Sequence, residues 1–240
     1  MTKNQSLDAV YDSLLKRNLS DALQAMAGYF SLYSGGQDVD RLYTIQADFQ
    51  LMADYWKRGF KDPQLSQLYN NLLRRLYVLY ADAAMRYEIK HTAYLSSIHA
   101  HLALSSHDWS FQALKDALEE FVTANAMLSL EPAHTQVDQK KAMHRRHQQL
   151  LADWFARLWL SSIWTDGEAS AMEEILLSPT IDTNDQQLLT SAIMLTLLNH
   201  FDIAKFRVLL SVYRHSPETS VRQRALIGWV LALHADIFFC

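Results

Sequence analysis

The chain has 240 residues, of which 50% are hydrophobic and 20% are charged, and its formal net charge at pH 7 is −4. This balance is typical of a folded globular protein rather than a disordered one. The negative net charge argues against a general electrostatic affinity for nucleic acid or anionic membranes. The single cysteine, Cys240, cannot form a disulfide within the chain, and no apolar run approaches the roughly 20 residues of a membrane-spanning helix. We therefore expect a cytoplasmic protein that makes no membrane contact.

Glycine and proline are scarce, at six and four residues. Strand-rich folds need many turns built from these two residues, whereas helices joined by short loops need few. Apolar residues recur at spacings of three and four, as they do from Leu65 to Tyr80, which predicts amphipathic helices. Before that stripe, Asp62 is placed to cap a helix and Pro63 to begin it. No stretch shows the alternation of a β-strand, so we predict an all-α protein.

In chain order, the turn residues and the apolar spacing predict helices over residues 5–17, 20–33, 38–58, 63–84, 85–105, 110–129, 136–163, 168–177, 184–199, 203–214 and 218–235. No glycine or proline marks the break near residue 84. One long helix over 63–105 therefore fits this region equally well.

Two C-terminal segments, which begin at Glu173 and Arg207, align without a gap at an offset of 34 residues. Each contains a short apolar helix, a turn with Ser, Pro or Asp, and a longer helix that is apolar at its centre. A fixed period of this length is typical of helical repeat proteins. The identical pairs include Leu176 with Leu210, Ile193 with Ile227, Leu197 with Leu231, His200 with His234 and Asp202 with Asp236.

The second segment resembles the HEAT-repeat family. The matching positions are the paired leucines Leu209-Leu210, the turn Ser216-Pro217-Glu218, and Val221-Arg222 with Ala225 at the start of the second helix. Ser216 stands where the family has aspartate, and Gly228-Trp229 stands where it has Ala-Leu. The first segment matches at Leu176-Leu177, Ser178-Pro179 and Ala192, but it has Gln187-Leu188 in the region of the Val-Arg element. The resemblance covers about residues 165–240 and implies stacked helical hairpins.

Such short hairpins cannot bury their own apolar faces, so neighbouring hairpins must stack to form a core. We expect an α-α superhelix with an N-terminal helical region over 1–163 and HEAT-like repeats over 164–240, packed as one continuous solenoid. The apolar ending from Ala235 to Cys240 lacks the polar face of a terminal repeat. We therefore expect residues 237–240 to be buried in a larger assembly, or the chain to be a segment of a longer repeat protein.

Tyrosine is concentrated between residues 43 and 94. A tyrosine ring can be half buried while its hydroxyl reaches a partner, and aromatic residues dominate many protein interfaces. If these tyrosines share one exposed face, they would form a protein-binding groove; otherwise they line the helical core. The candidate residues are Tyr43, Tyr55, Tyr69, Tyr77, Tyr80 and Tyr87.

One basic run stands near three tryptophans, Trp154, Trp159 and Trp164. Its residues are Lys140, Lys141, Arg145 and Arg146. Basic residues beside aromatic platforms can contact phosphates and bases, as in the HEAT-like alkylpurine DNA glycosylases. The tryptophans also continue an apolar helical stripe, however, and core packing explains them more simply.

The sequence contains no nucleotide-binding loop, nucleophile elbow or His-Glu-x-x-His motif. Glu88 and His91 have the Glu-x-x-His spacing of di-iron bundles, but the second copy that such a site needs is absent. The histidines at 99, 101 and 107, and those at 144 and 147, could approach one another, but a surface or core role explains them more simply. We therefore predict no cofactor, no metal ion and no catalytic residue.

These patterns favour a non-catalytic scaffold that presents a helical-repeat surface to a protein partner or to further repeats of a longer chain. The alternative is a HEAT-like nucleic-acid-binding protein or a DNA glycosylase-type enzyme. The basic run would contact phosphates in that case.

Overall fold

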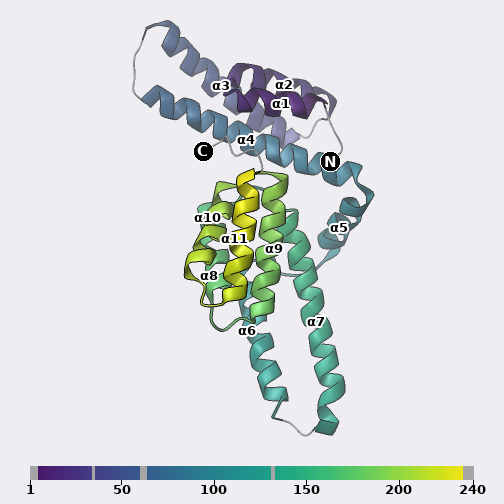
Figure 1. Ribbon diagram of the computed structural model, residues 1–240. Helices are drawn as coiled ribbons and strands as arrows, with labels where there is room; N and C mark the ends of the chain where they lie inside the picture. Colours follow the sequence, from purple (N-terminus) through teal and green to yellow (C-terminus); the bar gives the residue numbers. More distant parts are fainter. Residues whose placement is uncertain (1–4, 34–35, 60–63, 131–132, 235–240) are drawn as a thin grey trace. The chain divides into compact units, whose positions relative to one another are not determined.

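The computed structural model describes residues 5–33, 36–59, 64–130 and 133–234, and within these ranges the chain consists of helices joined by short loops and contains no strand (Figure 1). The chain divides into two compact units, one ending at Ser96 and one beginning at Ser97. Unit 1 contains α1 (Gln5–Leu15), α2 (Leu19–Leu32), α3 (Gly36–Lys57) and α4 (Gln64–His91). α5 (Ala93–Leu104) spans the division, and unit 2 continues with α6 (Phe111–Leu128), α7 (Ala133–Trp159), α8 (Asp166–Leu177), α9 (Thr183–Asn199), α10 (Ile203–His215) and α11 (Thr219–His234).

The all-α prediction is therefore confirmed, with two differences in the boundaries. The break expected near residue 84 falls at Thr92, so α4 is a single long helix. Helical hydrogen bonds reach Thr92 from both sides, because its N–H donates to Glu88 O and its carbonyl accepts from Ser96 N–H. No breaker residue is needed there, which is why the sequence does not mark the position. α7 ends at Trp159, and residues 160–165 form a connecting loop where the sequence predicted further helix.

Unit 1 is built on the α1–α2 hairpin, which packs against α4. The turn between α1 and α2 places Arg17 in the left-handed region, at φ 54°. Tyr69 of α4 fixes this turn, because its hydroxyl donates to Arg17 O at 2.5 Å and accepts from Leu19 N–H at 3.2 Å. Leu14 and Leu76 are fully buried in the core beneath it.

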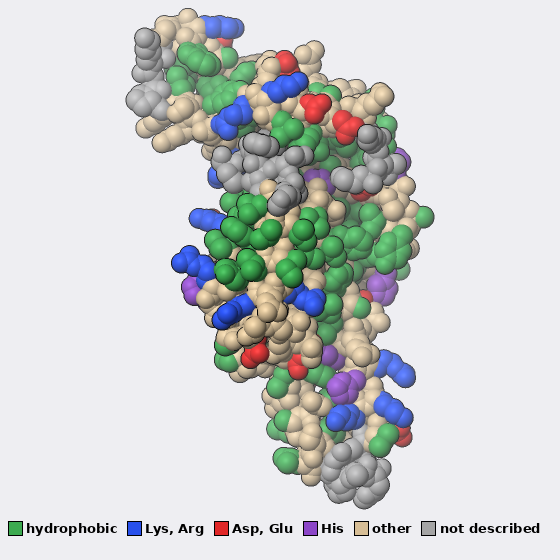
Figure 2. Space-filling view, viewed as in Figure 1, with side chains coloured by type: hydrophobic (Ala, Val, Ile, Leu, Met, Phe, Trp, Pro, Cys, Tyr) green, Lys and Arg blue, Asp and Glu red, His purple; other side chains and the backbone are tan. Residues whose placement is uncertain are grey.

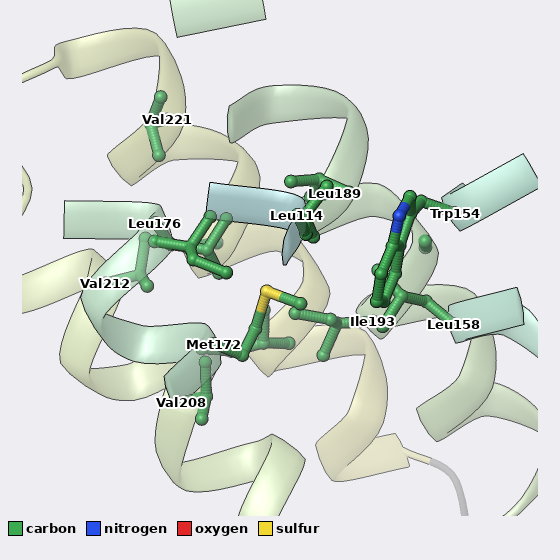
Figure 3. Packing of buried hydrophobic residues seen from close by; sticks show 14 of the residues in the cluster. Leu114, Trp154, Leu158, Met172, Leu176, Leu189, Ile193, Val208, Val212 and Val221 are labelled. Carbon is green, nitrogen blue, oxygen red and sulfur yellow. The ribbon is translucent and has the colours of Figure 1, made fainter. Parts of the chain in front are cut away.

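In unit 2 the helices lie in two rows. α9 lies between α7 and α11 in one row, and α8 packs against α6 and α10 in the other (Figure 1). Their apolar faces meet in one buried cluster that includes Trp154, Met172, Ile193 and Val208 (Figure 3). Because α6 and α7 contribute to this cluster, they belong with α8–α11. The compact units divide after Ser96. The expected arrangement, a helical region over 1–163 with HEAT-like repeats over 164–240 in one continuous solenoid, stays a prediction.

Side-chain caps fix where the unit 2 helices begin. Thr165 and Glu168 form a reciprocal capping box at the start of α8, and the side chains of Asp182 and Asp202 accept from the first N–H groups of α9 and α10. Such caps satisfy N–H groups that have no partner within the helix. The loops that precede α8 and α10 are therefore held in defined positions beside α7.

None of the described helices combines the length and the apolar character needed to cross a membrane. The expectation that residues 237–240 are buried concerns positions outside the described residues.

Candidate functional site

α11 carries apolar residues on two sides. One side, with Val221, Ala225 and Ala232, is buried against the rest of unit 2. On another side, Ile227 and Leu231 keep exposed fractions of 57% and 43%. A surface helix of a globular protein normally has one apolar stripe and a polar remainder. α11 therefore resembles a helix that packs between two neighbours, although only one of its apolar sides is covered by the described residues.

We call Ile227 and Leu231 the α11 open face. In Figure 2, hydrophobic side chains gather over α11 and the adjoining α9. Leu198 and Leu233 are also more than 40% exposed on these two helices. Scattered apolar residues are normal on a protein surface, but a contiguous group of them marks an interaction surface.

The 34-residue offset shows what covers the corresponding face of α9. Ile193 and Leu197, the equivalents of Ile227 and Leu231, are fully buried in the cluster that contains Trp154 and Leu158 of α7 (Figure 3). α7 also reaches this face through Leu158 O, which accepts from Thr196 Oγ1 at 2.8 Å. A helix therefore covers this face of α9, whereas no other described helix covers the equivalent face of α11.

α9 and α11 meet through their other apolar sides. A Cβ added to Gly228 would lie 3.0 Å from Cβ of Met194, the residue exactly one 34-residue offset earlier. One turn away, the Arg224 guanidinium donates to Ser191 Oγ at 2.7 Å. Each of the two helices therefore contacts the other through an equivalent side. The side of α9 that binds α7 and the α11 open face both point away from this contact, on opposite sides of the helix pair.

The six candidate tyrosines do not gather on one exposed face. Four of them lie on α4: Tyr77 is buried, the Tyr69 hydroxyl is bonded within unit 1, and Tyr80 and Tyr87 are partly buried. Tyr80 stacks on Tyr11 with ring centroids 5.7 Å apart, and burial raises its pKa. The α4 tyrosines therefore belong mainly to the packing of unit 1.

The other two candidates, Tyr43 and Tyr55, lie on α3 and are 64% and 48% exposed. Leu51 lies between them at helical spacing and is also exposed, as is the adjacent Trp56. Residues 43, 51 and 55 fall on one side of the helix because they are separated by multiples of four. Unit 1 thus presents an exposed apolar and aromatic stripe of its own.

The basic run Lys140, Lys141, Arg145 and Arg146 is exposed along the first half of α7. Arg146 lines a groove of about 780 Å³ between α6 and α7, together with Glu120 and Phe121. The tryptophans do not provide a platform beside this run, since Trp154 and Trp164 are buried and Trp159 is partly buried. The structure therefore separates the basic residues from the exposed tryptophan platform that the sequence suggested, although Arg146 shares its groove with the ring of Phe121.

Acidic or aromatic side chains contact five of the histidines noted in the sequence: His91, His101, His107, His144 and His147. Asp153, buried on α7, lies 3.1 Å from His101 Nε2 and 3.5 Å from His107 Nε2. His147 Nε2 lies 2.9 Å from Asp185 Oδ2, and the His147 ring stacks on Phe121. His91 stacks on Tyr87. In the described part of the chain, no three His, Cys, Asp or Glu side chains are arranged to hold a metal ion.

A second concave feature of unit 2, which we call the aromatic cleft, has a volume of about 640 Å³. Its walls include Trp109, Phe111, Trp154 and Trp164. Trp109 meets Trp154 edge to face with centroids 5.3 Å apart, and Phe111 meets Trp164 in the same manner at 5.9 Å. The Arg157 guanidinium carbon lies 4.8 Å from the Trp109 ring centroid.

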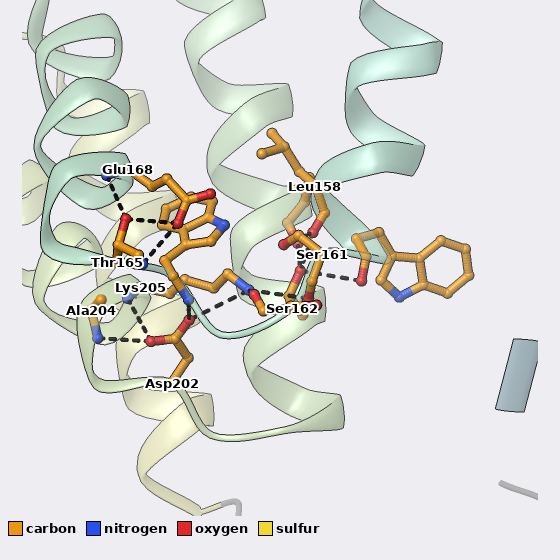
Figure 4. Close-up of polar contacts among 12 residues, drawn as sticks. Leu158, Ser161, Ser162, Thr165, Glu168, Asp202, Ala204 and Lys205 are labelled. Atoms are coloured by element: carbon orange, nitrogen blue, oxygen red, sulfur yellow. Dashed lines mark hydrogen bonds and ion pairs between the residues drawn. The ribbon is translucent and has the colours of Figure 1, made fainter. Parts of the chain in front are cut away.

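A buried ion pair holds the loop over residues 160–165, which forms one wall of this cleft (Figure 4). Lys205 is 1% exposed, and its ammonium group donates to Ser162 O at 2.7 Å and lies 3.5 Å from Asp202 Oδ2. Asp202 also accepts from Trp164 N–H at 2.8 Å. A buried charge is tolerated only when it is paired and hydrogen-bonded, and both conditions are met here.

Sequence reasoning missed the aromatic cleft and the ion pair, because their members come from distant segments. Trp109, Arg157, Trp164 and Lys205 share no motif or spacing. Asp202 carries the one local signal, since an aspartate before an apolar run marks a helix cap. Its pairing with Lys205 is also local, but nothing in the sequence shows that both are buried.

Comparisons of the chain with protein-family models, with curated proteins and with solved structures find no match.

Proposed function

We propose that this protein is a non-catalytic interaction scaffold, and that the α11 open face binds a helix of a partner protein. The observation that carries the proposal is the difference between equivalent positions. Ile193 and Leu197 are fully buried, whereas Ile227 and Leu231 are 57% and 43% exposed. An apolar face that is covered by a helix on α9 and uncovered on α11 indicates a site for another helix.

The proposed occupant is an amphipathic helix that packs on α11 as α7 packs on α9. α7 offers α9 the large apolar residues Trp154 and Leu158, and the α11 open face is entirely aliphatic. A partner stripe of Leu, Ile, Met or aromatic residues at spacings of three and four would bury it. The partner would thus extend the row formed by α7, α9 and α11.

Within this proposal, α8–α9 and α10–α11 are two HEAT-like repeats of a helical-repeat stack, and the partner helix continues it. The shared order of a shorter helix, a turn and a longer helix supports the repeat relationship. Stacked repeats contact only their neighbours, so an exposed apolar face on α11 is the kind of surface on which a further helix would stack.

The test compares three forms of the full chain as bait in an extract of the native cell. These forms are the wild type, the double variant Ile227→Glu/Leu231→Glu, and the control Val137→Glu, which places a single glutamate at a 53% exposed aliphatic residue of α7. Each captured protein is then purified, its affinity is measured by calorimetry, and hydrogen exchange maps where it binds.

We expect a captured protein to bind the wild type and Val137→Glu equally. We expect the double variant to bind it roughly tenfold or more weakly, because buried glutamates have no partner at such an interface. Residues 223–233 should gain protection in the complex. Equal capture by all three baits, protection confined to other helices, or self-association through this face would overturn the proposed partner helix.

The nucleic-acid alternative has weaker support. The basic residues of α7 are exposed, but Trp154 and Trp164 are buried, and the groove that Arg146 lines also contains the acidic Glu120. Recovery of nucleic acid with the wild-type bait, and its loss on changing Lys140 and Arg145 to Glu, would reverse this ranking.

A further inference from the structure

The aromatic cleft has the size and the lining of a ligand site. Its volume of about 640 Å³ falls within the range of small-molecule pockets, which is about 300–1,000 Å³. Such pockets combine apolar and aromatic walls with a few placed polar groups. Here the walls are the rings of Trp109, Phe111, Trp154 and Trp164, and the polar groups at the lining include Arg157 and Glu168.

Arg157 is the cation that faces this cleft, and it lacks an acceptor. Among the described residues, its guanidinium group makes the contact with the Trp109 ring but donates no hydrogen bond to a carboxylate or carbonyl. Partial burial lowers the pKa of Arg157, and the charge of Glu168 opposes this effect. A guanidinium group has five donors in a rigid planar fork, which matches the two oxygens of a carboxylate.

The Glu168 carboxylate is not the hydrogen-bond acceptor of Arg157. Its carboxylate accepts from Thr165 N–H and from Thr165 Oγ1, both at 2.8 Å, as part of the capping box of α8. These bonds hold it at the helix start. It nevertheless adds negative charge at the lining of the cleft, which disfavours a doubly charged phosphate more than a singly charged carboxylate.

Both sides of the cleft are held in place by buried carboxylates. Asp202 binds Trp164 N–H and pairs with Lys205, which fixes the loop over residues 160–165. Asp153 accepts from Gln149 Nε2 at 2.8 Å and contacts His101 and His107, which come from the segment before Trp109. A site whose walls are already ordered loses less entropy on binding.

We propose that the aromatic cleft binds an aromatic group that carries a carboxylate, with the ring against Trp109 and Phe111, the partly exposed rings of the lining, and the carboxylate on Arg157. A cationic ligand is disfavoured, because Arg157 already occupies the Trp109 ring and would repel a second positive charge. The same chemistry is presented by a free aromatic acid and by the C-terminus of a peptide that ends in an aromatic residue. This site is distinct from the α11 open face and does not depend on the proposed scaffold function.

Calorimetric titration of the full chain with four probes tests this inference. The probes are indole-3-acetate, its neutral amide indole-3-acetamide, the peptide N-acetyl-Gly-Gly-Trp with a free C-terminus, and the same peptide as the C-terminal amide. We expect one or both acids to bind at least roughly tenfold more tightly than the matching amide, because only the acid can pair with a guanidinium group. Tighter binding of the free acid identifies a small-molecule source, and tighter binding of the peptide acid identifies a protein C-terminus.

Two variants assign the effect to the cleft. Arg157→Met should remove the preference for the acid, whereas Arg145→Met, an exposed arginine earlier on α7, should leave it unchanged. Thermal unfolding followed by circular dichroism checks that both variants are folded. Equal affinity for acids and amides, no binding of any probe at millimolar concentration, or an acid preference that survives Arg157→Met would overturn the inference.

Discussion

Lys205 shows how a single residue stabilises the loop that borders the aromatic cleft. Its ammonium group is buried, pairs with Asp202, contacts the backbone at Ser161 and Ser162, and lies 5.0 Å from the Trp164 ring centroid. A lysine is rarely buried unless it is paired. The charge of Lys205 therefore connects α10 to the loop that follows α7.

At the residue scale, we predict that Lys205→Met lowers the free energy of unfolding by about 3 kcal/mol or more, because it leaves Asp202 buried without its counter-charge. Urea denaturation measures the change. The control Lys141→Met removes an exposed lysine of α7 and should alter stability by no more than about 0.5 kcal/mol. An unchanged urea midpoint for Lys205→Met would show that the pair does not stabilise this loop.

Tyr69 shows what the sequence can and cannot predict for a single residue. A tyrosine ring can pack in a core while its hydroxyl group reaches a hydrogen-bond partner. The partner of Tyr69, however, is the Arg17 carbonyl in its own unit. Residues 17 and 69 are far apart in the sequence, so only the packing of α4 on the α1–α2 hairpin reveals the contact.

At the scale of helices, the packing of α11 on α9 depends on a glycine. A Cβ at Gly228 would lie 3.0 Å from Met194 Cβ and 3.2 Å from Leu209 Cδ1. Met194 Cβ is attached directly to the backbone, so it cannot move aside without a shift of the helix. The close approach of the two helices therefore requires the absence of a side chain at residue 228.

We predict opposite effects for two alanine substitutions of helical glycines. Gly228→Ala should destabilise the protein by about 1 kcal/mol. Overpacking costs about 1–3 kcal/mol, and the higher helix propensity of alanine offsets about 1 kcal/mol of this cost. Gly28→Ala in α2 meets nothing within 4 Å, so it should stabilise the protein by up to about 1 kcal/mol. Chemical denaturation of both variants measures these changes. A stabilising Gly228→Ala would mean that α9 and α11 separate easily.

At the scale of the whole molecule, the division into two compact units predicts that local stability is also divided. Packing contacts within a cooperative unit are lost together when it opens. Leu76 is fully buried in unit 1, and α9 belongs to the separate cluster of unit 2.

We predict that Leu76→Ala, which removes about 2–5 kcal/mol of core packing, speeds amide hydrogen exchange in α1, α2 and α4 but not in α8–α11. Hydrogen exchange followed by mass spectrometry measures each helix separately. The partly exposed Leu68 of the same helix provides the control, since Leu68→Ala should change exchange far less. Equal acceleration in both units would show that they unfold as one.

The sequence by itself determined the helices, because apolar spacing, capping residues and the scarcity of glycine and proline act within a few residues. It also revealed the 34-residue offset between α8–α9 and α10–α11. Only the tertiary structure decided which apolar faces are covered. Ile193 and Ile227 are the same residue at equivalent positions, yet one is fully buried and the other is 57% exposed. Their local sequence cannot distinguish them, because burial depends on whether another helix lies alongside, and for α9 that helix comes from residues some 40 positions earlier in the chain.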